Sequence, residues 1–299
     1  MKTNVKRMKA DLTIDIIIYL CLFLILLIVA YPLYFIIIAS FSDPYQTNLG
    51  EVWLYPKGFT LQGYEKVYNE TRIWTGFKNS ALYTVVGVCI SLFLTLPAAY
   101  TLSRRELPGK RFLNFFCVFT MLFNGGLVST YLIVSQTLHL ENTFAAMVLP
   151  SAVSVYHLMV AKSFMQTNIP EELREAAAID GCGEFRFFIQ IAMPLCVSLI
   201  STLVLMFAIM RWNSYVDALL YLSDASRFPL QTVVKDFLMT MEGAQGFTSG
   251  QGSNIISETQ MANLTKYVII IICNLPLIII YPLIQKFLVK GMLGGAIKG

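Results

Sequence analysis

Long apolar stretches recur along the chain, and six of them are long enough to cross a membrane as helices. A helix needs about 20 apolar residues to span the hydrocarbon core, where no water can satisfy an open backbone. The predicted spans are residues 14–39, 77–102, 112–132, 144–165, 194–210 and 267–287. Pro32, Pro97 and Pro276 lie inside spans and are expected to bend them. This pattern predicts an all-α, polytopic membrane protein with six transmembrane helices.

Basic residues cluster at the ends of spans that are expected to face the cytoplasm. The clusters are Lys2, Lys6, Arg7 and Lys9; Arg104, Arg105, Lys110 and Arg111; and Lys286, Lys290 and Lys298. Both termini are therefore predicted to be cytoplasmic. The expected organisation is a cytoplasmic N-terminus (1–13), a first span with an outer loop (14–76), a core of five spans (77–287) with an inner loop at 166–194, and a cytoplasmic tail (288–299).

Composition supports this assignment and narrows the class of partner. Hydrophobic residues make up 56% of the chain and charged residues 13%, and the mean hydropathy is +0.64. The formal net charge of +4 is modest, and the basic residues do not form a stripe, so nucleic acid is excluded as a partner. Two long outer loops are expected, at about 40–76 and 212–266, and the second contains the Gly/Ser-rich stretch GAQGFTSGQGSN.

The inner loop between spans four and five is rich in acidic residues and predicts a short surface helix. Pro170 suits a first helical turn, and Glu171 lies where the helix dipole favours negative charge. Residues 175–179 are good helix formers, and Asp180-Gly181 provides a stop. The helix carries small residues at 176–178. It can either dock in a groove of a partner protein or serve as a solvated linker between two spans.

Family resemblance favours docking. The pattern Glu175-Ala176-Ala177, Gly181, Ile191 and Met193-Pro194 resembles the EAA signature of ABC importer permeases, EAA-x3-G-x9-I-x-L-P. Met193 replaces the usual Leu, which is a mild departure. The stretches RWNSYVDALLYLSDASRFPLQ (211–231) and KGMLGGAIKG (290–299) are similar to carbohydrate-uptake type 1 permeases, particularly the LplC/YtcP-like group, on the MalG-like side of the permease pair.

This resemblance implies a type I ABC importer permease fold with a cytoplasmic EAA coupling helix between helices 4 and 5. It implies four kinds of partner: a second homologous permease, two ATPase subunits, an extracellular solute-binding protein and a sugar substrate. The residues implied to couple the chain to the ATPase are Glu171, Arg174, Glu175, Ala176, Ala177, Asp180 and Gly181. By position, the Gly-rich outer segment 242–257 would contact the binding protein.

The chain itself is not expected to be an enzyme. It lacks G-x-x-x-x-G-K-[ST], so ATP and Mg are expected on the partner ATPase subunits. It contains only two histidines, His139 and His157, and neither is paired with a Cys or carboxylate at ligand spacing, so no metal site is expected. The implied function is passage of an oligosaccharide or related sugar through a bacterial cell membrane.

Sparse polar and aromatic residues in or near the spans are candidates for the substrate path. They are Tyr156, His157, Trp212, Asn213 and Asn274. For His157 the alternative is a neutral histidine hydrogen-bonded inside the bundle. For Trp212 the alternative is an aromatic anchor at the membrane interface.

Two other classes of protein fit less well. An ion-coupled secondary transporter usually needs an acidic group at mid-membrane, and none of the predicted spans has one near its middle. A membrane enzyme would need a convergent set of acid, base and nucleophile. Within the ABC class, permeases for non-sugar solutes share the EAA loop, so the sugar assignment depends on the two other stretches.

Overall fold

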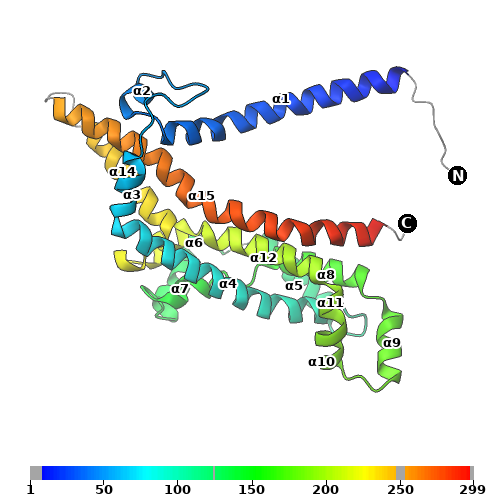
Figure 1. The fold of residues 1–299 in the computed structure, drawn as a ribbon. Coiled ribbons are helices and arrows are strands. Elements are labelled where there is room, and N and C mark those ends of the chain that lie inside the picture. Colours follow the sequence, from blue (N-terminus) through cyan, green and yellow to red (C-terminus); the bar gives the residue numbers. More distant parts are fainter. Residues whose placement is uncertain (1–8, 124, 247–252, 297–299) are drawn as a thin grey trace. The chain divides into compact units, whose positions relative to one another are not determined.

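The computed structural model describes residues 9–123, 125–246 and 253–296, and its regular elements are all helical (Figure 1). This confirms the predicted all-α class. The chain divides into two compact units. Unit 1 comprises Met1–Glu70 and Phe237–Ile272, and unit 2 comprises Thr71–Asp236 and Cys273–Gly299. Two helices, α14 (Leu230–Gly246) and α15 (Ser253–Ala296), contribute residues to both units.

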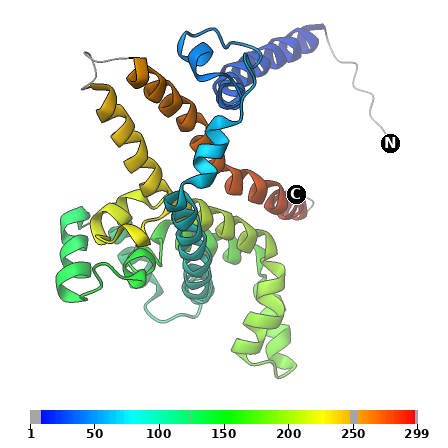
Figure 2. The same ribbon diagram turned by 60° about the vertical axis from the view of Figure 1, so that its left-hand side comes forward.

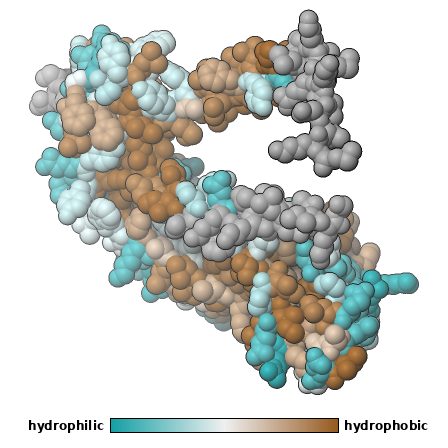
Figure 3. All heavy atoms as spheres, turned by 45° about the vertical axis from the view of Figure 1, so that its right-hand side comes forward, coloured by the Kyte–Doolittle hydropathy of each residue, from teal (hydrophilic) through white to brown (hydrophobic). Residues whose placement is uncertain are grey.

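Unit 1 contains α1 (Lys9–Ser40), α2 (Pro44–Asn48) and α3 (Gln62–Asn69). Most side chains of α1 are apolar and exposed, as expected of a helix in contact with lipid or a partner (Figure 3). Helix α2 begins where the Asp43 carboxylate accepts hydrogen bonds from the amides of Tyr45 and Gln46. Helix α3 packs closely on α15, since a Cβ at Gly63 would lie 3.0 Å from Leu264.

Unit 2 is built on α4 (Thr71–Ser103), α8 (Val155–Asn168) and α12 (Val197–Trp212). Their shared core includes Ala99, Ala161, Leu203 and Phe207, each with no exposed surface. Small residues on α4 let side chains of α12 approach its backbone. A Cβ at Gly87 would lie 2.9 Å from Nε of Arg211.

Shorter elements complete unit 2. They are α5 (Lys110–Leu122), α6 (Gly126–Leu132), η1 (Ile133–Thr137), α7 (Phe144–Val148), α9 (Glu171–Ile179), α10 (Glu184–Phe187), η2 (Phe188–Ala192), α11 (Met193–Leu195), α13 (Tyr215–Tyr221) and η3 (Ala225–Arg227). In both ribbon views α9 and α10 form a pair that protrudes from the rest of unit 2 (Figure 1, Figure 2). The inner loop is thus an ordered projection of the bundle.

Several span predictions need correction. Among the described residues, three helical segments are long and apolar enough to cross a membrane: Ile14–Ser40, Thr71–Ser103 and Gln260–Pro282. Counting each of two bent helix pairs as one span gives up to five, and one of these pairs bends by 80° next to Cys196. The fourth predicted span, 144–165, is divided into α7 and α8. The six-span count therefore stays a prediction.

Helices α1, α4 and α15 continue past Pro32, Pro97 and Pro276, and the bends expected there stay a prediction. One further expectation differs from the structure. The expected outer loops contain helices: α2 and α3 in the first, and α13, η3, α14 and the start of α15 in the second. Of the predicted Gly-rich segment, residues 247–252 lie outside the described residues, as do the N-terminal cluster up to residue 8 and Lys298.

Candidate functional site

The inner loop folds as the sequence predicts, with α9 occupying Glu171–Ile179. Pro170 takes the N-cap position with φ −61° and ψ 142°, and Glu171 and Glu172 lie in the first turn. There the helix dipole favours their negative charge. The predicted surface helix is confirmed, whereas its role in docking an ATPase stays a prediction.

The C-terminus of α9 is closed by two hydrogen bonds that define a Schellman motif. The amide of Cys182 donates to the Ala177 carbonyl at 2.9 Å, and the amide of Gly181 donates to the Ala178 carbonyl at 3.0 Å. Gly181 has φ +76°, which glycine adopts without the strain imposed by a Cβ. The predicted turn at Gly181 is therefore present, and it directs the chain back along α10.

Helix α9 has two faces of different character. Glu171, Arg174 and Ala177 recur every third residue and point toward the body of unit 2, where Ala177 is only 9% exposed. Ile179 lies on the other side and is 86% exposed. The remaining exposed residues of this helix are Glu172, Leu173, Glu175, Ala176 and Ala178. Of the three predicted small residues, Ala176 and Ala178 are thus available to a partner and Ala177 packs inside.

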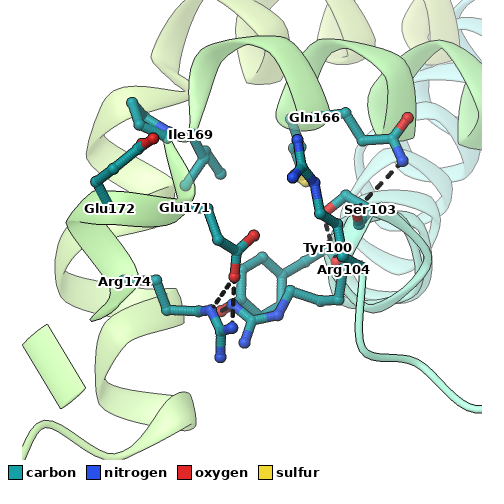
Figure 4. Close-up of a pocket in the computed structure, with 11 residues that line it drawn as sticks. Tyr100, Ser103, Arg104, Gln166, Ile169, Glu171, Glu172 and Arg174 are labelled. Atoms are coloured by element: carbon teal, nitrogen blue, oxygen red, sulfur yellow. Dashed lines mark hydrogen bonds and ion pairs between the residues drawn. The ribbon is translucent and has the colours of Figure 1, made fainter. Parts of the chain in front are cut away.

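Arg174 lies at the centre of an ion-pair cluster on the inward side of α9. Figure 4 shows its pairing with Glu171. Its Nε donates to Glu171 at 2.6 Å, within the same helix. One terminal nitrogen donates to Glu106 at 2.7 Å in the loop between α4 and α5, and the other to Glu184 of α10 at 3.3 Å. Its side chain is only 14% exposed. One guanidinium therefore connects α9 with two other segments.

A second arginine extends the cluster into α4. Arg104 donates to Glu184 at 2.8 Å, and the Tyr100 hydroxyl donates to the same carboxylate at 3.0 Å. Tyr100, Arg104, Gln166 and Arg174 contribute to the lining of a cleft of about 360 Å³ between α9 and the ends of α4 and α8 (Figure 4). Arg174 and Glu171 of α9 and Arg104 beside α4 thus belong both to the ion-pair cluster and to the lining of this cleft.

Arg174 and its carboxylate partners shift each other's pKa toward the charged forms. Its hydrogen bond and positive charge lower the pKa of the Glu106 carboxyl below the usual value. In turn, hydrogen bonds to Glu106 and Glu171 raise the pKa of Arg174. A carboxyl group whose pKa is lower in the folded than in the unfolded chain stabilises the fold at pH values above its unfolded pKa of about 4.3. This stabilisation is lost as the pH falls through the lowered pKa of the folded chain. The pair is therefore fully charged at neutral pH.

The candidate substrate-path residues lie on three elements of unit 2. Tyr156 is 53% exposed at the start of α8. The His157 ring packs edge-on against Phe207 of α12 with centroids 4.9 Å apart. Its Nδ1 is buried and has no hydrogen-bond partner among the described residues. The alternative role, a neutral histidine hydrogen-bonded inside the bundle, is therefore not satisfied at this nitrogen.

The other three candidates lie around the end of α12 and in α15. Trp212 is buried at 4% exposure, and its indole N–H donates to the Cys273 carbonyl at 2.9 Å. This packing favours a structural role over a stacking platform for Trp212. Asn213 is exposed and donates to the Ile209 carbonyl, while Asn274 is exposed next to Cys273. The assignment of these five residues to the substrate path stays a prediction.

Sequence reasoning missed Arg211, a fully buried arginine at the end of α12 with 2% exposure. Its guanidinium donates to the carbonyls of Met147 and Val148, each at 2.9 Å, and to the Ser151 hydroxyl at 2.6 Å. The available signal was its position at the end of an apolar run, because ionisable residues at membrane depth are rare and usually functional.

Metal binding has no visible basis in the described part of the chain, where no three His, Cys, Asp or Glu side chains lie close enough to share an ion. What the described residues do provide is a bundle of apolar helices, a protruding acidic loop and a few buried polar groups. These features define a helical membrane permease.

Comparison with known proteins places the chain within this class. It belongs to the family described as "Binding-protein-dependent transport system inner membrane component", whose pattern matches residues 73–294. It is thus an ABC importer permease. The EAA loop lies inside the matched range, and so do the unit 2 helices apart from the first two residues of α4 and the last two of α15.

Two relatives from Bacillus subtilis (strain 168) match over most of the chain. The polygalacturonan/rhamnogalacturonan transport system permease protein YtcP is 36% identical over 285 residues, covering 95% of this chain and 98% of the relative. Protein LplC is 35% identical over 268 residues, covering 90% and 89%. A chain from the crystal structure of a bacterial ABC transporter involved in import of the acidic polysaccharide alginate is 25% identical, with a TM-score of 0.81, covering 93% of this chain and 98% of that chain.

Proposed function

We propose that this chain is the permease subunit that moves an oligosaccharide across a bacterial cell membrane, with both of its termini in the cytoplasm. The names of its relatives, which concern polygalacturonan, rhamnogalacturonan and alginate, support a polysaccharide-derived substrate. The partners would be a second permease, two ATPase subunits and an extracellular binding protein. ATP and Mg would bind on the ATPase subunits, and this chain would convert their movement into transport.

The exposed face of α9 is the observation that carries this proposal. Ile179 is 86% exposed and Phe185, just beyond the turn, is 77% exposed. Apolar side chains this exposed on a polar loop indicate a protein interface. Exposed Glu172 and Glu175 on the same helix would pair with basic residues at the rim of the partner's groove. We assign this face to the ATPase.

The ion-pair cluster supplies the mechanical link behind that face. Arg174 joins α9 to the loop after α4, and Glu184 joins α10 to Arg104 near the end of α4. A displacement of α9 by the ATPase would therefore pull on α4, which packs along α8 and α12. Rigid-body rocking of such helices can exchange inward and outward access.

The test replaces Ile179 with Asp. Placing a carboxylate in the proposed apolar contact should strongly reduce ATPase co-purification and sugar uptake, while leaving the chain inserted and paired with the second permease. Leu61→Asp is the matched control, since Leu61 is 53% exposed in the first outer segment and should not affect ATPase binding. Normal ATPase co-purification by Ile179→Asp would contradict the assignment of this face.

A further inference from the structure

An interruption divides the fourth predicted span at a depth that lies within the membrane. Helix α7 ends at Val148 and α8 begins at Val155. Helix α8 has 14 residues, so it is about 21 Å long. Near its inner end, Gln166 bonds to the Ser103 carbonyl beside the polar cleft. Since the hydrocarbon core is about 30 Å thick, residues 149–154 would lie inside it, toward the outer side, in the proposed orientation of the chain.

Arg211 supplies hydrogen-bond donors to the carbonyl groups on the α7 side of this interruption. The carbonyls of Met147 and Val148 lose the donors that a further helical turn would supply, and the guanidinium of Arg211 donates to both at 2.9 Å. The same guanidinium donates to the Ser151 hydroxyl at 2.6 Å. Gly87 leaves room for the arginine stem, because a Cβ there would lie 2.9 Å from Nε. The interruption is therefore a built feature that Arg211 holds in place.

The backbone amides on the α8 side of the interruption lack hydrogen-bond partners among the described residues. The amides of Val153 and Ser154 have no hydrogen-bond partner in the part of the chain that the structure describes. Leu149, Val153 and Tyr156 are 49%, 44% and 53% exposed. At membrane depth, irregular backbone is tolerated only where it is buried in protein or lines a water-filled cavity. Amides without acceptors favour the cavity, since water and hydroxyl groups can accept their hydrogen bonds.

Two buried polar atoms point to the same conclusion. Nδ1 of His157, in the first turn of α8, is buried without a partner, and so is Nε of Arg211, among the described residues. The His157 ring contacts Phe207, one helical turn before Arg211 on α12. Buried polar groups are almost always hydrogen-bonded to protein or to ordered water. Their occurrence beside the interruption indicates that water reaches this part of the bundle.

We infer that residues 149–156 form a wall of a water-filled sugar path and a contact site for sugar hydroxyls. The amides of Val153 and Ser154 would donate to hydroxyl oxygens, and the exposed Tyr156 ring would stack on a C–H face of the sugar. Arg211 would be a positioning residue that keeps the backbone open without touching the substrate. This inference rests on the proposed transport function and adds to it a location for the sugar.

Thiol accessibility tests the inference independently of transport. In the complete transporter with its native cysteines removed, Val153→Cys should react with a charged, membrane-impermeant methanethiosulfonate at least tenfold faster than native Cys89 retained alone. Cys89 is the depth-matched control, because it is exposed on continuous α4, about 21 Å from the end of that helix at Ser103. Equal reactivity of the two thiols would contradict the inference, because residues 149–156 would then face lipid or a partner subunit.

Modification should also block the path. Uptake of oligogalacturonates, used as the probe, should fall at least tenfold after Val153→Cys is modified, while basal ATP hydrolysis persists. Unchanged uptake after complete modification would likewise overturn the inference. Failure of the unmodified transporter to take up any sugar would instead count against the proposed function, so the two outcomes are distinguishable.

Discussion

At the scale of single residues, Arg174 shows why geometry matters more than strength in this loop. Its carboxylate partners on neighbouring segments, Glu106 and Glu184, are 70% and 61% exposed. Exposed ion pairs contribute only about 0 to 1 kcal/mol each, because water screens them. The cluster therefore adds little to folding stability. Its effect is to hold α9 in one orientation relative to the loop after α4, which is the property that transmission of movement requires.

The first prediction at this scale concerns Arg174→Gln. The variant should fold, insert and bind the ATPase, since the exposed face of α9 is unchanged. It should nevertheless transport less sugar per ATP hydrolysed, by about three- to tenfold, because the link to Glu106 is broken. Arg186→Gln is the control, because within the described part of the chain Arg186 bonds only to Gln190 in the same segment. Uptake and ATP hydrolysis should be measured together in proteoliposomes, and equal ratios for both variants would refute the linking role.

At the scale of elements, local signals made α9 predictable and tertiary contacts made the break in span four unpredictable. Pro170, two glutamates and Asp180-Gly181 specify the start and stop of α9 without help from the rest of the chain. Residues 144–165 are apolar enough to form one span on composition alone. The break depends on Arg211, which is about 60 residues away in sequence and supplies the missing donors. Pro150 was the only local indication, because proline disfavours helix in the residue before it.

A second prediction concerns the turn after α9. Gly181→Ala should strain the backbone by about 1 to 2 kcal/mol, because Ala avoids the left-handed region that φ +76° requires. Nothing lies within 4 Å of the added Cβ, so the effect is purely conformational. Gly183→Ala is the control, with equally open space and φ −69°.

Hydrogen exchange measures this effect directly. The amides that close α9, those of Gly181 or its replacement and Cys182, should exchange about five- to thirtyfold faster in Gly181→Ala and at the parental rate in Gly183→Ala. Equal exchange in the two variants would show that the left-handed turn does not limit the stability of α9.

At the scale of the whole molecule, apolar patterning predicted the helical class and the long spans but not the outer segments. Residues 212–266 read as a loop because polar, glycine and aromatic residues are mixed there. In the structure, contacts with α4 order part of this stretch: Asn79 donates to the Ser226 and Phe228 carbonyls, and the Tyr83 hydroxyl donates to the Arg227 carbonyl. Such pairings join residues about 150 positions apart, so no local pattern could reveal them.

As proposed above, this chain passes a sugar through the membrane using ATP hydrolysed by separate subunits. The most direct test reconstitutes the chain with its second permease and ATPase subunits in proteoliposomes, with ATP inside and a sugar-loaded binding protein outside. We expect labelled oligosaccharide to accumulate only when both ATP and the binding protein are present, and to do so even after ion gradients are collapsed. Accumulation driven by an ion gradient in the absence of ATP would contradict it.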